Sequence, residues 1–179
     1  VKDSGAVNTI FLKKGKVTGE NTDGRGFVRS MEKDMQIKFK NKSVYIIGAG
    51  GASYGIITEL IKKQVKVIDI TNRTQKKTDD LIDYFKQTNV EFNNSTWPEL
   101  KPKSHTDIII NTSSFGMKKG ELLKINCSNL RSKTIFSDII YNPKETETKK
   151  FLKEKGYKTI NGLGMLIEQA AVSFNLWFN

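Results

Sequence analysis

The stretch Val44-Tyr45-Ile46-Ile47-Gly48-Ala49-Gly50-Gly51-Ala52 decides the fold of this chain. Residues 43–47 form a continuous apolar run, which is typical of a strand buried in a parallel sheet. The glycines predict a tight turn, and a helix is expected to follow to about Lys63. Such a unit lets the backbone approach a pyrophosphate at the helix N-terminus. Because position 53 is serine, the strict three-glycine pattern fails, and a glycine turn without a ligand remains an alternative.

Outward from this turn, strands alternate with helices. Further strands are expected at residues 65–71, 90–92, 107–111, 134–139 and 157–160, and helices at 75–87 and 145–155. Continuous apolar strands between helices indicate a parallel sheet that is covered on both faces. Residues 43–161 are therefore predicted to form a doubly wound, Rossmann-like α/β domain. Within it, Trp97-Pro98-Glu99-Leu100 suggests a single helical turn.

The flanking segments predict a different arrangement. Residues 5–18 suggest two short strands around a Lys-Gly turn, and a helix over 22–36 follows, capped by Asn21 or Thr22. The last helix, over 163–178, carries apolar residues around much of its circumference. One face of the sheet domain cannot cover all of them, so this helix is expected to expose apolar area.

Composition excludes several classes of protein. The 179 residues carry a net charge of +11, but only four of the 30 basic residues are arginines, and the lysines are spread along the chain. This pattern favours a solvated surface that attracts anionic metabolites over nucleic-acid binding. No apolar stretch approaches the roughly 18 residues that span a bilayer, so no membrane partner is expected. One cysteine, Cys127, and one histidine, His105, exclude a Cys/His metal site and favour a reducing, cytoplasmic setting.

The end of the second strand bears on the choice between NAD and NADP. Asp69 lies 21 positions after Gly48, about where an acid would hold the ribose of NAD. The strand tip, however, lies nearer Asn72-Arg73-Thr74, and Lys77 follows closely. A guanidinium, a hydroxyl and an ammonium group suit a 2′-phosphate, so the sequence favours NADP(H). Ordinary surface charge at a helix start is the alternative interpretation of Arg73 and Lys77.

Six motifs then occur in a characteristic order. They are Gly5-Ala6-Val7-Asn8-Thr9, Asn21-Thr22-Asp23-Gly24, Gly48-Ala49-Gly50-Gly51-Ala52, Asn72-Arg73-Thr74, Asn111-Thr112-Ser113 before Gly116-Met117, and Gly162-Leu163-Gly164-Met165-Leu166 with Gln169-Ala170. Together they resemble the shikimate dehydrogenase family. The resemblance implies an NADP-dependent oxidoreductase of aromatic amino-acid biosynthesis, which reduces 3-dehydroshikimate to shikimate reversibly.

The resemblance also implies roles for individual residues. Asp23 is expected to be catalytic, as the partner of a general acid–base lysine. The substrate contacts would be Asn8, Asp23, Tyr141 and Gln169. The cofactor contacts would be Gly48, Ala49, Gly50, Gly51, Ala52, Asn72, Arg73, Thr74, Lys77, Ile139, Gly162 and Met165. No metal ligand is expected. From the residues alone, Asp23 could instead offset the helix dipole, and Met165 could be ordinary core.

The family pattern is matched only in its later two-thirds. The family carries a Ser-x-Ser substrate motif and the catalytic lysine in an N-terminal α/β domain, and neither has a counterpart in these 179 residues. The resemblance therefore implies a remnant of the substrate domain with a connecting helix at 1–36, an NADP-binding domain at 37–161, and a C-terminal helix at 162–179 that returns toward the substrate domain. A homodimer is a further expectation.

Two alternatives stay open at this point. An NAD-using quinate/shikimate dehydrogenase of the same family would give Asp69 its role. A non-catalytic NADP-binding module would explain the lack of the lysine. In either case the chain would bind a dinucleotide, and the first would also take a small-molecule substrate.

Overall fold

Six parallel strands form the central sheet of the computed structural model, which describes residues 5–178. The strands are β3 (Ser43–Ile47), β4 (Val67–Thr71), β5 (Glu91–Asn94), β6 (Ile108–Asn111), β7 (Ile135–Asp138) and β8 (Lys158–Ile160). Their spatial order is β5-β4-β3-β6-β7-β8, and every neighbouring pair is parallel. This order reverses between β3 and β6, as in doubly wound dinucleotide-binding folds. The predicted fold class is confirmed.

Helices and loops cover the two faces of this sheet differently. α1 (Asp23–Asp34), α2 (Gly51–Lys62) and α3 (Gln75–Phe85) contribute to one core cluster, in which Phe27, Ile57 and Leu81 pack with strand residues. The opposite face packs against α4 (Glu147–Glu154) and loop residues such as Leu123. Successive residues of β3 alternate between the two clusters, which is why the run is apolar throughout.

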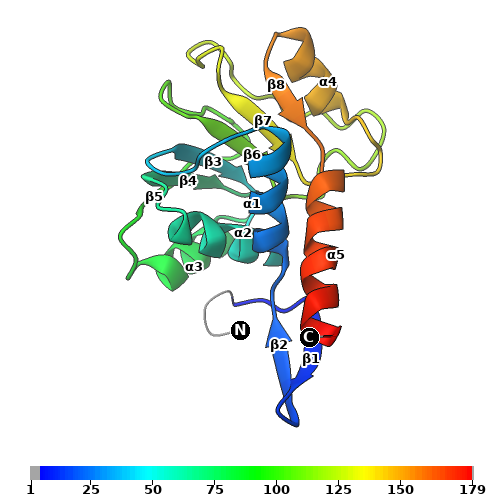
Figure 1. Ribbon diagram of the computed structural model, residues 1–179. Coiled ribbons are helices and arrows are strands. Elements are labelled where there is room, and N and C mark those ends of the chain that lie inside the picture. Colours follow the sequence, from blue (N-terminus) through cyan, green and yellow to red (C-terminus); the bar gives the residue numbers. More distant parts are fainter. Residues whose placement is uncertain (1–4, 179) are drawn as a thin grey trace.

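A hairpin and the last helix stand apart from the sheet. β1 (Thr9–Lys13) and β2 (Lys16–Glu20) pair antiparallel, and α5 (Leu163–Phe178) runs beside α1 down to the hairpin. Figure 1 shows the hairpin projecting below the sheet, with α1 between α2 and α5. The indole Nε1 of Trp177 donates a hydrogen bond of 2.9 Å to the carbonyl oxygen of Ile10. Segments from the two ends of the chain therefore form one unit around α1.

Glycine allows α1 to approach both neighbouring helices closely. A β-carbon added at Gly24 would lie 1.9 Å from the carbonyl oxygen of Gly55 in α2. One added at Gly26 would lie 2.7 Å from the carbonyl oxygen of Met165 in α5. Real side chains do not tolerate such distances, so α1 is held with its backbone directly against α2 on one side and α5 on the other.

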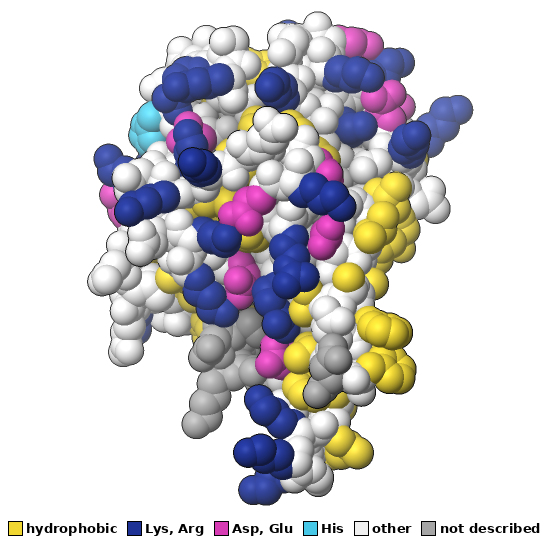
Figure 2. Space-filling view, in the orientation of Figure 1, with side chains coloured by type: hydrophobic (Ala, Val, Ile, Leu, Met, Phe, Trp, Pro, Cys, Tyr) yellow, Lys and Arg dark blue, Asp and Glu magenta, His cyan; other side chains and the backbone are white. Residues whose placement is uncertain are grey.

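The last helix exposes apolar side chains, as predicted. Figure 2 shows them gathered along the edge that α5 occupies in Figure 1. The large exposed apolar residues of α5 are Leu163, Leu166, Ile167, Phe174, Trp177 and Phe178, and those of the hairpin are Ile10, Leu12 and Val17. These residues form an apolar strip, which is the largest apolar patch that Figure 2 shows on the described residues. No helix within residues 5–178 has the length and apolar character needed to cross a membrane.

Most expected elements lie where the sequence placed them, with ends shifted by a few residues. One prediction is wrong: Trp97–Leu100 forms no helical turn, because Leu100 is buried and forms an isolated parallel bridge with Ile125. The division at residues 36 and 161 stays a prediction. Residues 1–4 of the expected first segment and residue 179 of the last lie outside the described residues.

The close contact between α1 and α2 gives a direct test. Gly24→Ala should lower the free energy of unfolding by about 3 kcal/mol, because the new methyl group overpacks against the backbone of Gly55. Gly51→Ala is the matched control, since its β-carbon would meet only the Ala6 side chain at 3.7 Å. Urea unfolding of both variants measures the difference. Equal free energies of unfolding for Gly24→Ala and Gly51→Ala would show that the fold does not depend on the close contact between the α1 and α2 backbones.

Candidate functional site

The glycine turn after β3 lies at the point where the strand order reverses. Gly48 has φ +118°, a conformation that favours glycine, and its N–H donates to the carbonyl oxygen of Thr71 at 2.8 Å. A β-carbon there would lie 2.6 Å from Thr112 Oγ1. At Gly50, by contrast, an added β-carbon would meet nothing within 4 Å. The turn is thus packed on its inner side and open on its outer side.

Ser53, which breaks the three-glycine pattern, holds this turn together. It is buried, and its hydroxyl donates to the carbonyl oxygen of Gly48 at 3.0 Å. The N–H of Gly50 donates back to Ser53 Oγ at 3.2 Å, and Thr112 Oγ1 lies 2.7 Å away. A serine at this position therefore ties the turn to the segment that follows β6.

The predicted phosphate-binding residues follow the adjacent strand. Ile47 at the end of β3 pairs with Thr71 at the end of β4, so the two turns are neighbours. The Asn72 side chain donates to the carbonyl oxygen of Thr74 at 2.9 Å, which shapes the turn. Arg73, Thr74 and Lys77 are exposed. One exposed cation, Arg73, therefore stands on the turn next to the open glycine backbone, and a second, Lys77, stands in the first turn of α3.

Asp69 lies in a different environment. It is only 2% exposed, within β4 rather than at its end, and Lys103 Nζ lies 2.8 Å from its Oδ1. The carboxylate already has a cationic partner inside the fold. The sequence offered either Asp69 or the turn at Asn72 and Arg73 as the nucleotide-binding end of this strand. In the structure the strand tip is formed by Asn72 and Arg73, and not by Asp69.

The residues predicted near the nicotinamide lie beyond β7. A β-carbon on Gly162 would lie 1.8 Å from the carbonyl oxygen of Ile139, so these two backbones are in direct contact. Met165 is 8% exposed and belongs to the main core cluster. Tyr141 is exposed, and no hydrogen bond between described residues joins it to Asn8, Asp23 or Gln169. A contact of these residues with cofactor or substrate stays a prediction.

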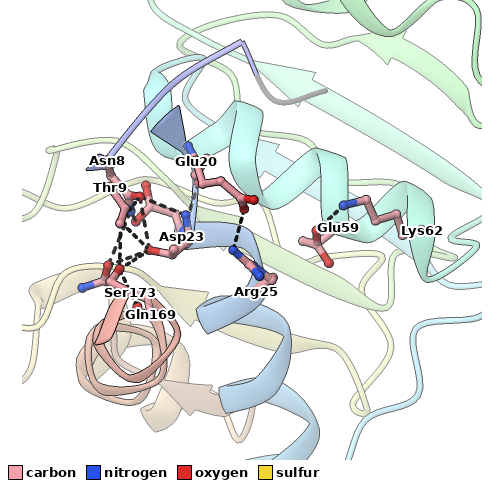
Figure 3. A network of polar contacts seen from close by, with 11 residues as sticks. Asn8, Thr9, Glu20, Asp23, Arg25, Glu59, Lys62, Gln169 and Ser173 are labelled. Atoms are coloured by element: carbon pink, nitrogen blue, oxygen red, sulfur yellow. Dashed lines mark hydrogen bonds and ion pairs between the residues drawn. The ribbon is translucent and has the colours of Figure 1, made fainter. Parts of the chain in front are cut away.

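Asn8, Asp23 and Gln169 meet in one polar network, although they are far apart in sequence (Figure 3). Asn8 Nδ2 lies 2.8 Å from Asp23 Oδ1 and 3.4 Å from Gln169 Oε1. Asn8 precedes β1, Asp23 begins α1 and Gln169 lies on α5. The hairpin, α1 and α5 thus each contribute one of the three predicted substrate contacts.

The electrostatic setting of Asp23 is unusual for a surface acid. Partial burial raises the pKa of its carboxyl group, and the hydrogen bond from Asn8 acts in the opposite direction. Arg25 pairs with Glu20 at 2.7 Å, and no ion pair between described residues involves Asp23. A partly desolvated carboxylate without a cationic partner can accept a hydroxyl or stabilise an ammonium group that approaches it.

The two parts of the site adjoin at the start of α2. The β-carbon of Ala6 would lie 3.7 Å from one built on Gly51, and the Asn21 side chain packs against Gly55. Asn8 and Asp23 each lie two residues beyond these contacts. The polar network and the glycine turn are therefore placed by the same helix end.

Sequence reasoning missed several residues of this site. Thr9, Thr22 and Ser173 bring buried hydroxyls against the network, and Ser53 and Thr112 stabilise the glycine turn. Thr9, Thr22 and Thr112 stand inside the quoted motifs but were given no role in the site. Ser173 lies outside the motifs, and its signal is that it follows Gln169 by one helical turn and so shares its face.

His105 and Cys127 add no further site. His105 is exposed, and burial raises the pKa of the half-buried Cys127 thiol, which makes a thiolate less available. Within residues 5–178, no group of three or more His, Cys, Asp or Glu side chains is placed to hold a metal ion.

Comparison with known proteins agrees with this geometry. The family described as "Shikimate / quinate 5-dehydrogenase" matches residues 30–161, and the "Shikimate 5'-dehydrogenase C-terminal domain" matches residues 162–179. "Shikimate dehydrogenase (NADP(+))" of Geobacillus sp. (strain WCH70) is 40% identical over 174 residues, which cover 97% of this chain and 63% of that protein. The chain thus spans slightly less than two-thirds of this relative.

Solved structures show the same relationship. Shikimate 5-dehydrogenase from Listeria monocytogenes, in complex with shikimate and NAD, superposes with a TM-score of 0.87 at 30% identity, over 98% of this chain and 64% of that one. Ligand-free 5-ketofructose reductase of Gluconobacter sp. strain CHM43 gives 0.86 at 33% identity, over 97% and 63%. On the family match over residues 30–161, the chain belongs to the shikimate/quinate 5-dehydrogenase family.

Proposed function

We propose that this chain supplies the NADP(H)-binding domain and one wall of the substrate pocket of a shikimate dehydrogenase. The reaction would be the reversible reduction of 3-dehydroshikimate to shikimate, a step of aromatic amino-acid biosynthesis. The observation that carries the proposal is the network of Asn8, Asp23 and Gln169 beside the glycine turn. A carboxylate and two amides suit a ligand with several hydroxyl groups.

The residues of the glycine turn fit a dinucleotide. The outer side of Gly50 is open, which lets a diphosphate approach the backbone and the N-terminus of α2. Arg73 on the neighbouring turn and Lys77 in the first turn of α3 are exposed and form no ion pair with another described residue. Bound NADPH would supply a hydride for the substrate carbonyl. The chain itself would hold the phosphates and place the substrate with its carbonyl toward Ile139 and Gly162.

Asp23 would act on the proton side of the reaction. A carbonyl oxygen that receives a hydride also gains a proton, so a donor is needed. The family's lysine has no counterpart in residues 1–179. In the proposal, a lysine from outside this chain gives the proton, while the Asp23 carboxylate stabilises its ammonium form and accepts a substrate hydroxyl.

The two alternative functions, an NAD-using quinate/shikimate dehydrogenase and a non-catalytic NADP-binding module, have less support from the structure than this proposal. An NAD-using quinate/shikimate dehydrogenase would need an acid at the tip of β4, but Asp69 is buried against Lys103. A non-catalytic NADP-binding module would not need Asn8, Asp23 and Gln169 together. We also propose a cytoplasmic location, for which the free thiol of Cys127 is the support.

Cofactor preference tests the nucleotide part of the proposal. Arg73→Ala should weaken NADP+ binding by about 1.5–3 kcal/mol, the range for a hydrogen bond to a charged group, and leave NAD+ binding almost unchanged. Titration calorimetry with both nucleotides measures this. Lys76→Ala, which removes an exposed cation three residues further along the chain, is the control and should have a much smaller effect. Equal affinities for the two nucleotides in the unchanged protein would contradict the assignment.

Replacing the carboxylate tests the catalytic part. In the natural gene product, Asp23→Asn should lower turnover by orders of magnitude and leave NADP+ affinity nearly unchanged, because Asp23 lies on the substrate side. Since burial raises its pKa, the ionised form costs folding stability at neutral pH. Asp23→Asn should therefore unfold at a higher temperature at pH 7, and the gain should shrink as the pH falls toward 4. Near-normal turnover of Asp23→Asn would contradict the catalytic role and would mean that Asp23 only offsets the dipole of α1.

The 179 residues alone give a third test. They should bind NADP+ but reduce 3-dehydroshikimate at no meaningful rate, because general acid–base assistance is worth about 10²–10⁴-fold. The exposed apolar residues of α5 should also make the isolated chain self-associate. Spectrophotometric NADPH oxidation and sedimentation velocity measure the two effects. Robust turnover would refute the need for an outside lysine, and a monomer at high concentration would refute the self-association.

A further inference from the structure

Thr22 stands where a threonine usually caps a helix, but its hydroxyl is used elsewhere. It directly precedes α1, has helical backbone angles (φ −99°, ψ −8°) and makes no side-chain capping bond. Its side chain is fully buried. The hydroxyl instead lies 3.2 Å from Asn8 Oδ1 and 3.1 Å from Gln169 Oε1. The residue therefore serves the polar network more than its own helix.

The backbone N–H of Thr22 determines which way the Asn8 amide points. It lies 2.9 Å from Asn8 Oδ1. A backbone N–H only donates, so the Asn8 atom that faces it must be the oxygen. The Asn8 Nδ2 group is then turned toward Asp23 and Gln169, where it is in fact placed.

The same logic fixes Gln169. Asn8 Nδ2 only donates, so the Gln169 atom that faces it is the oxygen. The Thr22 hydroxyl, 3.1 Å away, can donate to the same oxygen. The Gln169 Nε2 group consequently points the other way and donates to the carbonyl oxygen of Leu166 at 3.2 Å. That carbonyl can only accept, so an independent contact confirms the same orientation. One N–H of Gln169 remains for a ligand.

Two further buried hydroxyl groups contact the hydroxyl of Thr22. Ser173 Oγ lies 3.0 Å from Thr22 Oγ1 and 2.8 Å from Thr9 Oγ1 (Figure 3 shows Thr9 and Ser173 with the network). Ser173 also donates to the carbonyl oxygen of Gln169 at 3.0 Å. All three hydroxyl residues are buried and come from β1, the start of α1 and α5. Buried hydroxyls without partners are costly, so the cluster resists rotation of any member.

We propose that Thr22 is a positioning residue with two contributions. Its backbone N–H sets the donor–acceptor polarity of Asn8, and its buried hydroxyl, with Thr9 and Ser173 as support, keeps the amide oxygens of Asn8 and Gln169 in place. The inference rests on the proposed function, in which both amides contact the substrate. The fixed polarity leaves a carboxylate oxygen of Asp23 as an acceptor and Gln169 Nε2 as a donor. A ligand group that meets both must donate and accept, which a hydroxyl does and an ammonium or a carboxylate does not.

Thr22→Val tests this in the natural gene product. Valine keeps the shape and the backbone N–H, and with it the polarity of Asn8. It removes only the hydroxyl that keeps the amide oxygens of Asn8 and Gln169 in place. The KM and Kd for shikimate should rise about 5- to 20-fold, the loss of one to two neutral hydrogen bonds, while the Kd for NADP+ stays within about twofold. Thr22→Ser restores the hydroxyl and should stay within about threefold of the unchanged protein. Unaltered shikimate binding by Thr22→Val would overturn the inference.

A matched control separates positioning from stability. Thr134 is also buried and donates to the carbonyl oxygen of Thr106 at 2.8 Å, away from the network. Thr134→Val should lose a comparable amount of stability but bind shikimate as before. An equal loss of shikimate binding in both variants would mean a general structural effect and would contradict the positioning role.

A second measurement does not depend on activity. Nitrogen-15 NMR should show the side-chain amide protons of Asn8 exchanging with solvent at least several-fold faster in Thr22→Val than in the unchanged protein. If the unchanged protein binds no shikimate, the proposed function fails, and this exchange rate still decides the inference. Identical exchange rates in the two proteins would overturn it.

Discussion

The backbone contact between α1 and α2 at Gly24 and Gly55 is the constraint that places the hairpin, α5 and the polar network against the six-stranded sheet. α1 joins the six-stranded sheet to the hairpin and α5, because it packs on α2 through Gly24 and on α5 through Gly26. Asp23 directly precedes Gly24, so the distance between the two helix axes also sets the distance between the carboxylate and the glycine turn. Any larger residue at position 24 would push the polar network away from the glycine turn.

The two parts of the site depend on different interactions. On the proposed nucleotide side, an open turn and exposed cations provide long-range attraction for an anion. On the proposed substrate side, partly buried amides, hydroxyls and one carboxylate form short, directional hydrogen bonds with one another. The first arrangement tolerates movement of its side chains. The second depends on each atom being a donor or an acceptor in the right place, and buried hydroxyls behind it supply that order.

The sequence predicted the parts of the molecule that depend on local pattern. β3 and α5 lie at the predicted residues, because a continuous apolar run and helical spacing are visible without knowledge of the fold. Features set by contacts distant in sequence were not visible. Leu100 is drawn into a bridge with Ile125, Asp69 is neutralised by Lys103, and the hydroxyl of Thr22 turns away from its helix toward residues 14 and 147 positions away. Of the two predicted capping residues, Asn21 accepts a hydrogen bond of 3.0 Å from the N–H of Asp23, whereas Thr22 makes no capping bond.

The positions of the two tryptophans have a practical consequence. Trp177 is 54% exposed and hydrogen-bonded to the hairpin at Ile10. Trp97 is half-buried against Phe115 and packs on the core cluster of the sheet face that α4 covers. An indole in water emits at longer wavelength than one in an apolar setting. The intrinsic fluorescence of this chain therefore contains two separable signals, one from the attachment of α5 to the hairpin and one from the loops over the sheet. Each part can be followed optically without a label.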